Sequence, residues 1–268
     1  MKRALAVTSI TLLVSLLLAF PAGAIAPPPN DLITNATRIT LPYLASEDTH
    51  GAQPDGPTRC FGNRASVFFK FRPLEDKEVV ADTFGADYDT VLSVWTGPLS
   101  ALTRVACKDD FLFSLQSALH FQAHAGKRYF VMASTCCGTG SGGGGQLEVS
   151  VRRAPANPPS VTVNVSGGTT DAASGVATLS GTFDCNHRML IEFEGTLRER
   201  VNSTFAAHGT FDVISVCNRG TAAAWTADVP PDGDIAFAPG NAKLYFDFFA
   251  GDGVATSSGD GSAPVVLS

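Results

Sequence analysis

The sequence lacks the short motifs that mark many enzymes of known chemistry. No Gly-x-Ser-x-Gly nucleophile motif occurs, and no serine or cysteine motif accompanies any of the five histidines. No Cys-x-x-Cys pair offers an ordinary zinc-ligand spacing. The glycine-rich stretch 138–145 leads into Gln-Leu-Glu-Val, which reads as a strand, whereas a phosphate-binding loop needs a lysine and a helix. These absences argue against triad hydrolases, zinc sites and nucleotide-binding loops.

Positive charge is also scarce. The chain has 19 Lys and Arg against 25 Asp and Glu, which gives a formal net charge of −6. Because it is acidic and shows no basic stripe, it is a poor candidate for binding nucleic acid or anionic membranes. No apolar run beyond residue 24 is long enough to cross a bilayer, so we expect no membrane span in the mature chain.

The first residues have the pattern of a secretory signal. Lys2 and Arg3 precede an apolar run that extends to Phe20, and small residues follow up to Ala24. A charged start, an apolar centre and a small-residue cleavage site are typical of a signal peptide. Residues 1–24 are therefore predicted to be removed, and the mature protein to be secreted, either extracellular or at the cell surface.

The rest of the chain alternates with a period of two. In the segment 66–72, Val67, Phe69 and Phe71 alternate with polar or charged residues, which is typical of a half-buried strand. Further strands are predicted at 77–84, 89–96, 117–123, 127–134, 146–152, 177–183, 188–197, 210–216, 222–229 and 243–249. No segment offers three turns of helical periodicity. The predicted fold class is all-β.

A proline-rich stretch divides the strands into two groups. Residues 153–160 contain three prolines and no apolar periodicity, which is the usual composition of a linker. We therefore expect two β-sandwich domains, at 25–152 and at 161–268. The two halves show no repeat of one another, so the domains are predicted to differ in kind.

The first domain resembles the bacterial pre-peptidase C-terminal domain family. The matching residues are Asn30-Asp31 with Ala36, Cys60 with Ser66 to Phe71, Asp82-Thr83, Asp89 to Leu92, Thr96-Gly97, Cys107 with Asp109-Asp110, and Ala125-Gly126 with Tyr129. The resemblance covers roughly half of the mature chain. It implies a jelly-roll-like sandwich. It does not imply peptidase activity, because members of the family are appendages to catalytic domains.

The second domain resembles, more faintly, a secreted actinobacterial domain of uncharacterised function. The residues that carry this resemblance are Leu179 to Thr182 with Cys185, then Cys217, Trp225 and Phe237 to Gly240. An immunoglobulin-like sandwich is expected here. Trp225 follows both cysteines, whereas immunoglobulins place the tryptophan between them, so membership of that family is not inferred.

Six cysteines predict disulfide staples. An even number in an exported chain favours disulfide bonds. The two-domain division leaves one pair downstream, Cys185–Cys217, and two pairs upstream, of which we expect one to be Cys60–Cys107. Cys136 and Cys137 then remain, and adjacent cysteines can bond to each other only through a strained small ring. For this pair a loop clip and a redox role both stay open.

Acidic residues gather in two segments of the first domain. Asp87 and Asp89 lie in the hairpin 81–97, and Asp109 and Asp110 lie in the next acidic segment, 106–110. Calcium prefers several oxygen ligands from short acidic loops, so these four aspartates form a candidate calcium site. The alternative is that they bond backbone amides in turns.

Tyr88 and Trp95 flank the same acidic hairpin. Their rings could form a platform for a sugar, although Trp95 shares its strand face with residues expected at the sheet, so burial is an equal alternative. The sequence favours a non-catalytic binding or accessory protein for an extracellular polysaccharide or protein. A hydrolase that uses the acidic hairpin and a purely structural surface protein are the alternatives.

Overall fold

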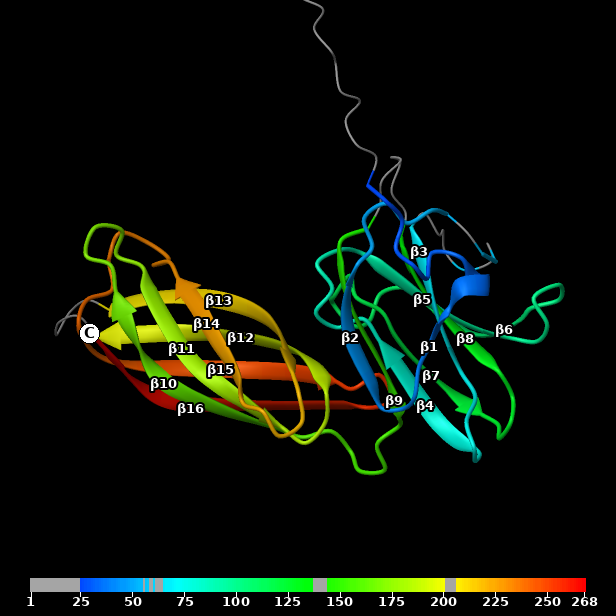
Figure 1. Ribbon diagram of the computed structural model, residues 1–268. Helices are drawn as coiled ribbons and strands as arrows, with labels where there is room; N and C mark the ends of the chain where they lie inside the picture. The colour runs from blue at the N-terminus through cyan, green and yellow to red at the C-terminus, as the bar shows by residue number, and fades with distance from the viewer. Residues whose placement is uncertain (1–24, 55, 58–59, 61–64, 137–143, 201–205) are drawn as a thin grey trace, which may run out of the picture.

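The computed structural model describes residues 25–54, 56–57, 60, 65–136, 144–200 and 206–268. The predicted signal peptide therefore lies outside the described residues. Strands β1 to β9 form one domain and β10 to β16 form a second, and the two lie end to end (Figure 1). The all-β class predicted from the alternation is confirmed. In the described part of the chain, no helix has the length and apolar character that crossing a bilayer requires.

The first domain is a sandwich of two sheets. A five-stranded sheet has the order β1-β3-β8-β5-β6 and a four-stranded sheet has the order β2-β9-β4-β7. The strands and the short 3-10 helix η1 are η1 (Ile33–Asn35), β1 (Thr37–Arg38), β2 (Tyr43–Asp48), β3 (Ser66–Phe71), β4 (Lys77–Asp82), β5 (Thr90–Thr96), β6 (Thr103–Lys108), β7 (Ala118–Ala123), β8 (Tyr129–Thr135) and β9 (Gln146–Arg153). All neighbouring strands pair antiparallel except β1 and β3.

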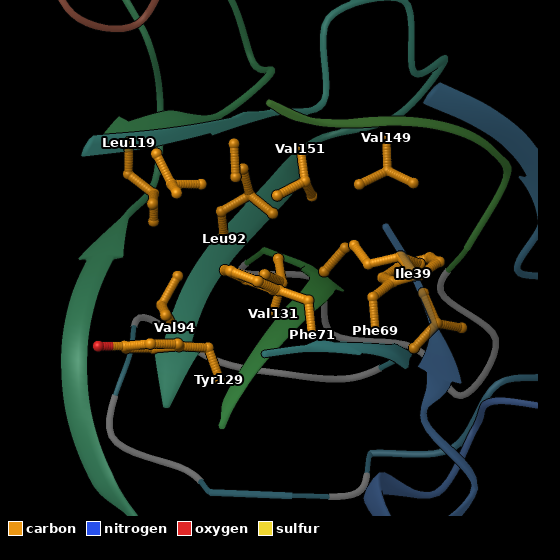
Figure 2. Packing of buried hydrophobic residues seen from close by; sticks show 14 of the residues in the cluster. Ile39, Phe69, Phe71, Leu92, Val94, Leu119, Tyr129, Val131, Val149 and Val151 are labelled. Carbon is orange, nitrogen blue, oxygen red and sulfur yellow. The ribbon is translucent and has the colours of Figure 1, made fainter. Parts of the chain in front are cut away.

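The core of this domain lies between its two sheets (Figure 2). Phe69 and Phe71 point inward from β3, as the period of two predicts, because alternate side chains of a strand face opposite sides. They meet Val149 and Val151 of β9 across the gap. This apolar layer fixes which face of the five-stranded sheet looks outward.

The second domain is built from one continuous seven-stranded sheet. Its order is β13-β12-β15-β16-β10-β11-β14, and only the β10–β16 pair is parallel. The strands are β10 (Val161–Thr170), β11 (Ala177–Cys185), β12 (Met189–Arg200), β13 (Ala206–Cys217), β14 (Ala223–Val229), β15 (Gly240–Gly251) and β16 (Thr256–Leu267). The sheet curls over its own core, so its layers enclose the apolar side chains as in a sandwich (Figure 1).

Aromatic rings fill the centre of the second domain. Trp225 is buried, and its ring lies 4.9 Å from that of Phe193 and 6.0 Å from that of Phe183, measured between centroids. The two outermost strands of the sheet, β13 and β14, approach each other. The Asp232 N–H, in the segment after β14, donates a 2.8 Å hydrogen bond to the carbonyl of His208 in β13. Trp225 is thus a core residue of this domain.

A charged network and an apolar cluster join the two domains. Arg188, just before β12 of the second domain, is buried and donates to Asp82 and Glu148 of the first, at 3.0 and 2.6 Å. Arg152 of β9 also donates to Asp82, and in addition to the carbonyl of Asp252, at 2.9 Å. Beside this network, Phe84, Phe111 and Leu190 pack together in an apolar cluster.

Candidate functional site

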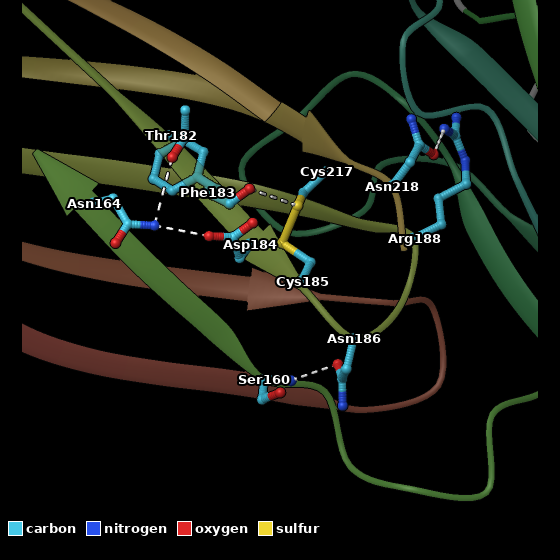
Figure 3. The surroundings of a disulfide bond; sticks show 10 residues. All are labelled: Ser160, Asn164, Thr182, Phe183, Asp184, Cys185, Asn186, Arg188, Cys217 and Asn218. Carbon is cyan, nitrogen blue, oxygen red and sulfur yellow. Dashed lines mark hydrogen bonds between the residues drawn. A yellow bond between two sulfur atoms is a disulfide. The ribbon is translucent and has the colours of Figure 1, made fainter. Parts of the chain in front are cut away.

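Two predicted disulfide bonds are confirmed. Cys60 is bonded to Cys107 in the first domain, and Cys185 to Cys217 in the second (Figure 3). Cys136 is also disulfide-bonded. Cys137 lies outside the described residues, so the bond considered between Cys136 and Cys137 is not described.

The acidic segments converge because of how β5 and β6 pair. Asp89 stands just before β5 and Asp109 just after β6. Since the two strands are antiparallel neighbours, the start of one and the end of the other lie at the same edge. One carboxylate oxygen of each aspartate and the Cys136 sulfur lie within 4.8 Å of one another.

The charge of this cluster is not balanced by hydrogen bonds. Within the described residues, one buried oxygen of Asp89 and one of Asp109 have no hydrogen-bond partner. Burial, reinforced by the negative charge of Asp110, raises the pKa of both carboxyl groups. An oxygen-only donor set of this kind suits a hard cation, whereas the Cys136 sulfur, 3.4 Å from Asp109 Oδ2, is already in a disulfide and is no calcium ligand.

Asp87 is placed differently from the other three aspartates. Its Oδ1 accepts a 2.8 Å hydrogen bond from the backbone N–H of Gln146, and its own N–H donates to the Gln146 carbonyl. This is the turn-bonding role that the sequence left open as the alternative. The structure therefore brings Asp89, Asp109 and Asp110 together and ties Asp87 to the start of β9.

Trp95 and Tyr88, the two rings predicted to form a sugar-binding platform, are not exposed to solvent. Trp95 is 3% exposed, and its Nε1–H donates a 2.7 Å hydrogen bond to Ser93 Oγ. Tyr88 is half-buried, and its hydroxyl accepts a hydrogen bond from Thr49 Oγ1 at 3.2 Å. Burial raises the pKa of Tyr88 to about 12. Both rings are packing residues, which for Trp95 is the alternative stated above.

The outer face of the five-stranded sheet carries a different set of side chains. Its register aligns five residues across β1, β3, β8, β5 and β6, namely Arg38, Lys70, Phe130, Trp95 and Arg104. The two aromatic rings in the middle are covered by Ile33 of η1 and by Leu102. Cations therefore flank a small apolar cluster on this face.

Three adjoining hollows run along the same face, and we call them together the outer groove. The first, of about 380 Å³, is lined by Ile33, Thr34, Arg38, Lys70, Phe71, Arg72, Leu99, Arg128 and Phe130. The second, of about 780 Å³, shares Ile33 and Leu99 with the first and continues along residues 100–104. The third, of about 420 Å³, shares Arg72 and Arg128 with the first. The first hollow therefore adjoins each of the other two.

Sequence reasoning did not find the outer groove. The cations of its first hollow come from β1, from β3 and the residue after it, and from the turn before β8, so no basic run or stripe appears in the linear sequence. The available signal was the alternation in 66–72, which places Lys70 and Arg72 opposite the buried phenylalanines.

No protein-family model matches this chain, and no curated protein matches it. Among solved structures, the chain is similar to a Bacteroides uniformis β-glucuronidase, with 9% identity and a TM-score of 0.24 over 75% of this chain and 26% of that chain. It is similar to a GH2 β-galacturonidase from Eisenbergiella tayi, with 10% identity and a TM-score of 0.26 over 76% of this chain and 36% of that chain. A Parabacteroides merdae β-glucuronidase gives 10% identity and a TM-score of 0.24 over 85% of this chain and 30% of that chain. The chain thus spans between 26% and 36% of these proteins, and likenesses this weak carry no functional conclusion.

Proposed function

We propose that this protein is a secreted, non-catalytic binding or accessory module that engages an extracellular polysaccharide or protein. The observation that carries the proposal is the outer groove, whose three hollows lie side by side on the first domain and share lining residues. A long open groove suits an extended polymer better than a small enclosed ligand. Disulfide bonds support an extracellular location, because they persist in oxidising compartments.

A calcium ion belongs to this proposal as a structural cofactor. Asp89, Asp109 and Asp110 would hold it between the start of β5 and the end of β6. The supporting observation is the pair of buried carboxylate oxygens without hydrogen-bond partners. A cation there would neutralise like charges and fix the ends of β5 and β6, two strands of the sheet that carries the outer groove.

Retention on insoluble polymers tests the binding function. The full secreted chain is mixed with polysaccharides and with a collagen-like protein, and retention on at least one is expected. Ser100→Trp fills the groove and should abolish retention, whereas Ser258→Trp, at an exposed position of the second domain, should not. A parallel screen on glycan and ester substrates should show no turnover. Retention of both variants alike, or turnover, would contradict the proposal.

A further inference from the structure

We propose that the outer groove binds an anionic polysaccharide, through carboxylate or sulfate groups held by Arg38, Lys70, Arg72 and Arg128. This inference rests on the proposed binding function and adds the chemical class of the ligand. It stands on the composition of the first hollow, on the charge state of its walls and on the charge distribution of the whole chain.

The first hollow is lined by four cations and no acid. Arg38 comes from β1, Lys70 and Arg72 from β3 and the residue after it, and Arg128 from the turn before β8. Strands β1, β3 and β8 are neighbours in the sheet, so their ends bring these side chains around one pocket of about 380 Å³. Three of the four are arginines, whose planar guanidinium groups bind oxyanions through paired hydrogen bonds.

These cations are not neutralised by the protein itself. Within the described part of the chain, none of the four side chains forms an ion pair or a hydrogen bond. An acid in the adjoining loop, Glu75, is already paired with Lys77 at 3.2 Å and with Arg153 at 3.5 Å. Like charges held close together repel, so an incoming anion relieves a repulsion in addition to gaining hydrogen bonds.

The apolar part of the lining of the first hollow suits a sugar ring more than a free inorganic ion. Ile33 and Leu99 form part of its wall, and Leu99 is 46% exposed. Apolar surface beside convergent polar groups is typical of sites for organic ligands. The adjoining hollows extend the same surface on both sides, which allows a chain of sugars to continue beyond the charged centre.

The distribution of charge favours a sparsely charged glycan over nucleic acid. The chain is acidic overall, and the sheet register of the second domain places a row of exposed carboxylates across four strands, formed by Asp212, Glu194, Asp247 and Asp260. A polymer with a charge at about every 1.7 Å would be repelled by such a surface. In the groove, Phe130 and Trp95 are buried and so cannot stack on bases.

Affinity measurements with matched polymers test this inference. Alginate supplies carboxylates, dextran sulfate supplies sulfates, and dextran supplies a neutral chain. The full protein should bind at least one anionic polymer, with affinity falling as salt rises, and should not bind dextran. Arg72→Gln and Arg128→Gln should each weaken binding about tenfold, the size expected for a lost charge-assisted hydrogen bond. Arg219→Gln removes the same charge from an exposed turn of the second domain and should leave affinity unchanged.

The outcomes separate this inference from the function on which it rests. If the protein binds dextran or another neutral polymer equally well and the charge variants behave as wild type, the binding function stands and the anionic ligand is wrong. If no anionic polymer binds, the inference is overturned, and binding to a neutral polymer or a protein then decides the broader proposal. If alginate alone or dextran sulfate alone binds, the inference stands and its oxyanion is identified.

Discussion

Arg188 Nε donates a 3.0 Å hydrogen bond to Asp82 Oδ1, which joins residues 106 positions apart and belonging to different domains. Asp82 is fully buried, and Arg188 is 6% exposed. The same guanidinium also donates to the carbonyl of Phe84 and to Glu148. Because every one of these acceptors lies in the first domain, Arg188 links the second domain to the first through buried hydrogen bonds.

Replacing Arg188 by methionine should destabilise the protein by about 3–5 kcal/mol, because Asp82 would remain as a buried charge with fewer partners. Denaturant unfolding followed by tryptophan fluorescence measures this change. Asp82→Asn in the same background should restore part of the loss. Arg153→Met, which removes an exposed pair with Glu75, is the control and should change stability by about 0.5 kcal/mol or less. An Arg188→Met variant as stable as the control would contradict the coupling.

Removing the Cys185–Cys217 disulfide should cost about 4 kcal/mol, since it closes a loop of 32 residues and restricts the unfolded chain. A Cys185→Ser/Cys217→Ser variant and its parent would be compared by thermal unfolding in the absence of reductant. The second domain should melt earlier while the first domain, which keeps Cys60–Cys107, retains its transition. Equal melting temperatures of the variant and its parent would show that the bond contributes nothing to stability.

Calcium should bind protein that has been freed of metal ions with a chelator, and it should raise the melting temperature, because it would neutralise Asp89 and Asp109. At a hundredfold excess over the dissociation constant the gain is about 2.7 kcal/mol. Asp109→Asn should lose the response to calcium. Without calcium this variant should be more stable than wild type by a few tenths to about 1 kcal/mol, because a repulsion is removed. Asp87→Asn changes the same charge outside the cluster and should keep the response. Calorimetry that detects no heat would remove the calcium site.

Tyr88 should make the protein unstable in alkali. Burial disfavours the phenolate and raises the pKa of Tyr88 from the ordinary value of 10.0 to about 12 in the folded protein. The unfolded chain loses this proton first, so the associated stability is complete below pH 10 and is lost progressively between pH 10 and 12. Unfolding free energies measured across this range should fall less steeply for Tyr88→Phe. Absorbance of phenolate in denatured protein provides the reference titration. Identical slopes for both proteins would contradict the assignment.

The sequence was most informative where one face of a strand is buried and the other is polar. Ile191 and Phe193 of β12 are fully buried, as their alternation with Glu192 and Glu194 predicts. Both disulfides were also predicted, and for Cys185–Cys217 the linker sufficed, because it leaves these two cysteines as the pair of the second domain. Such patterns depend only on the period of two along a strand, so they can be recognised in the sequence without knowledge of the tertiary structure.

Strand β16 was missed because its sequence resembles a loop. Gly259 and Gly261 lie opposite Phe248 and Phe246 of β15, and a Cβ at either glycine would lie 2.8 or 2.5 Å from the facing ring. The glycines are there because aromatic rings of the neighbouring strand cover them. A requirement set by a partner strand cannot be read from the strand itself.

The outer groove could not be predicted for a related reason. Arg38, Lys70 and Arg128 are distant in sequence and meet only because β1, β3 and β8 are adjacent. The aspartates were easier, since Asp89 and Asp109 flank two consecutive strands. Short-range order was therefore accessible from sequence, whereas sites assembled by sheet order were not.

Hydrogen exchange of the full protein with and without a polymer that retains it tests the central claim most directly. If the outer groove is the binding surface, bound polymer should slow exchange at residues 33–38 and 98–104, and the Ser100→Trp variant should show no such protection. Protection confined to the second domain, or to the turn 85–89 of the acidic hairpin, would contradict the account.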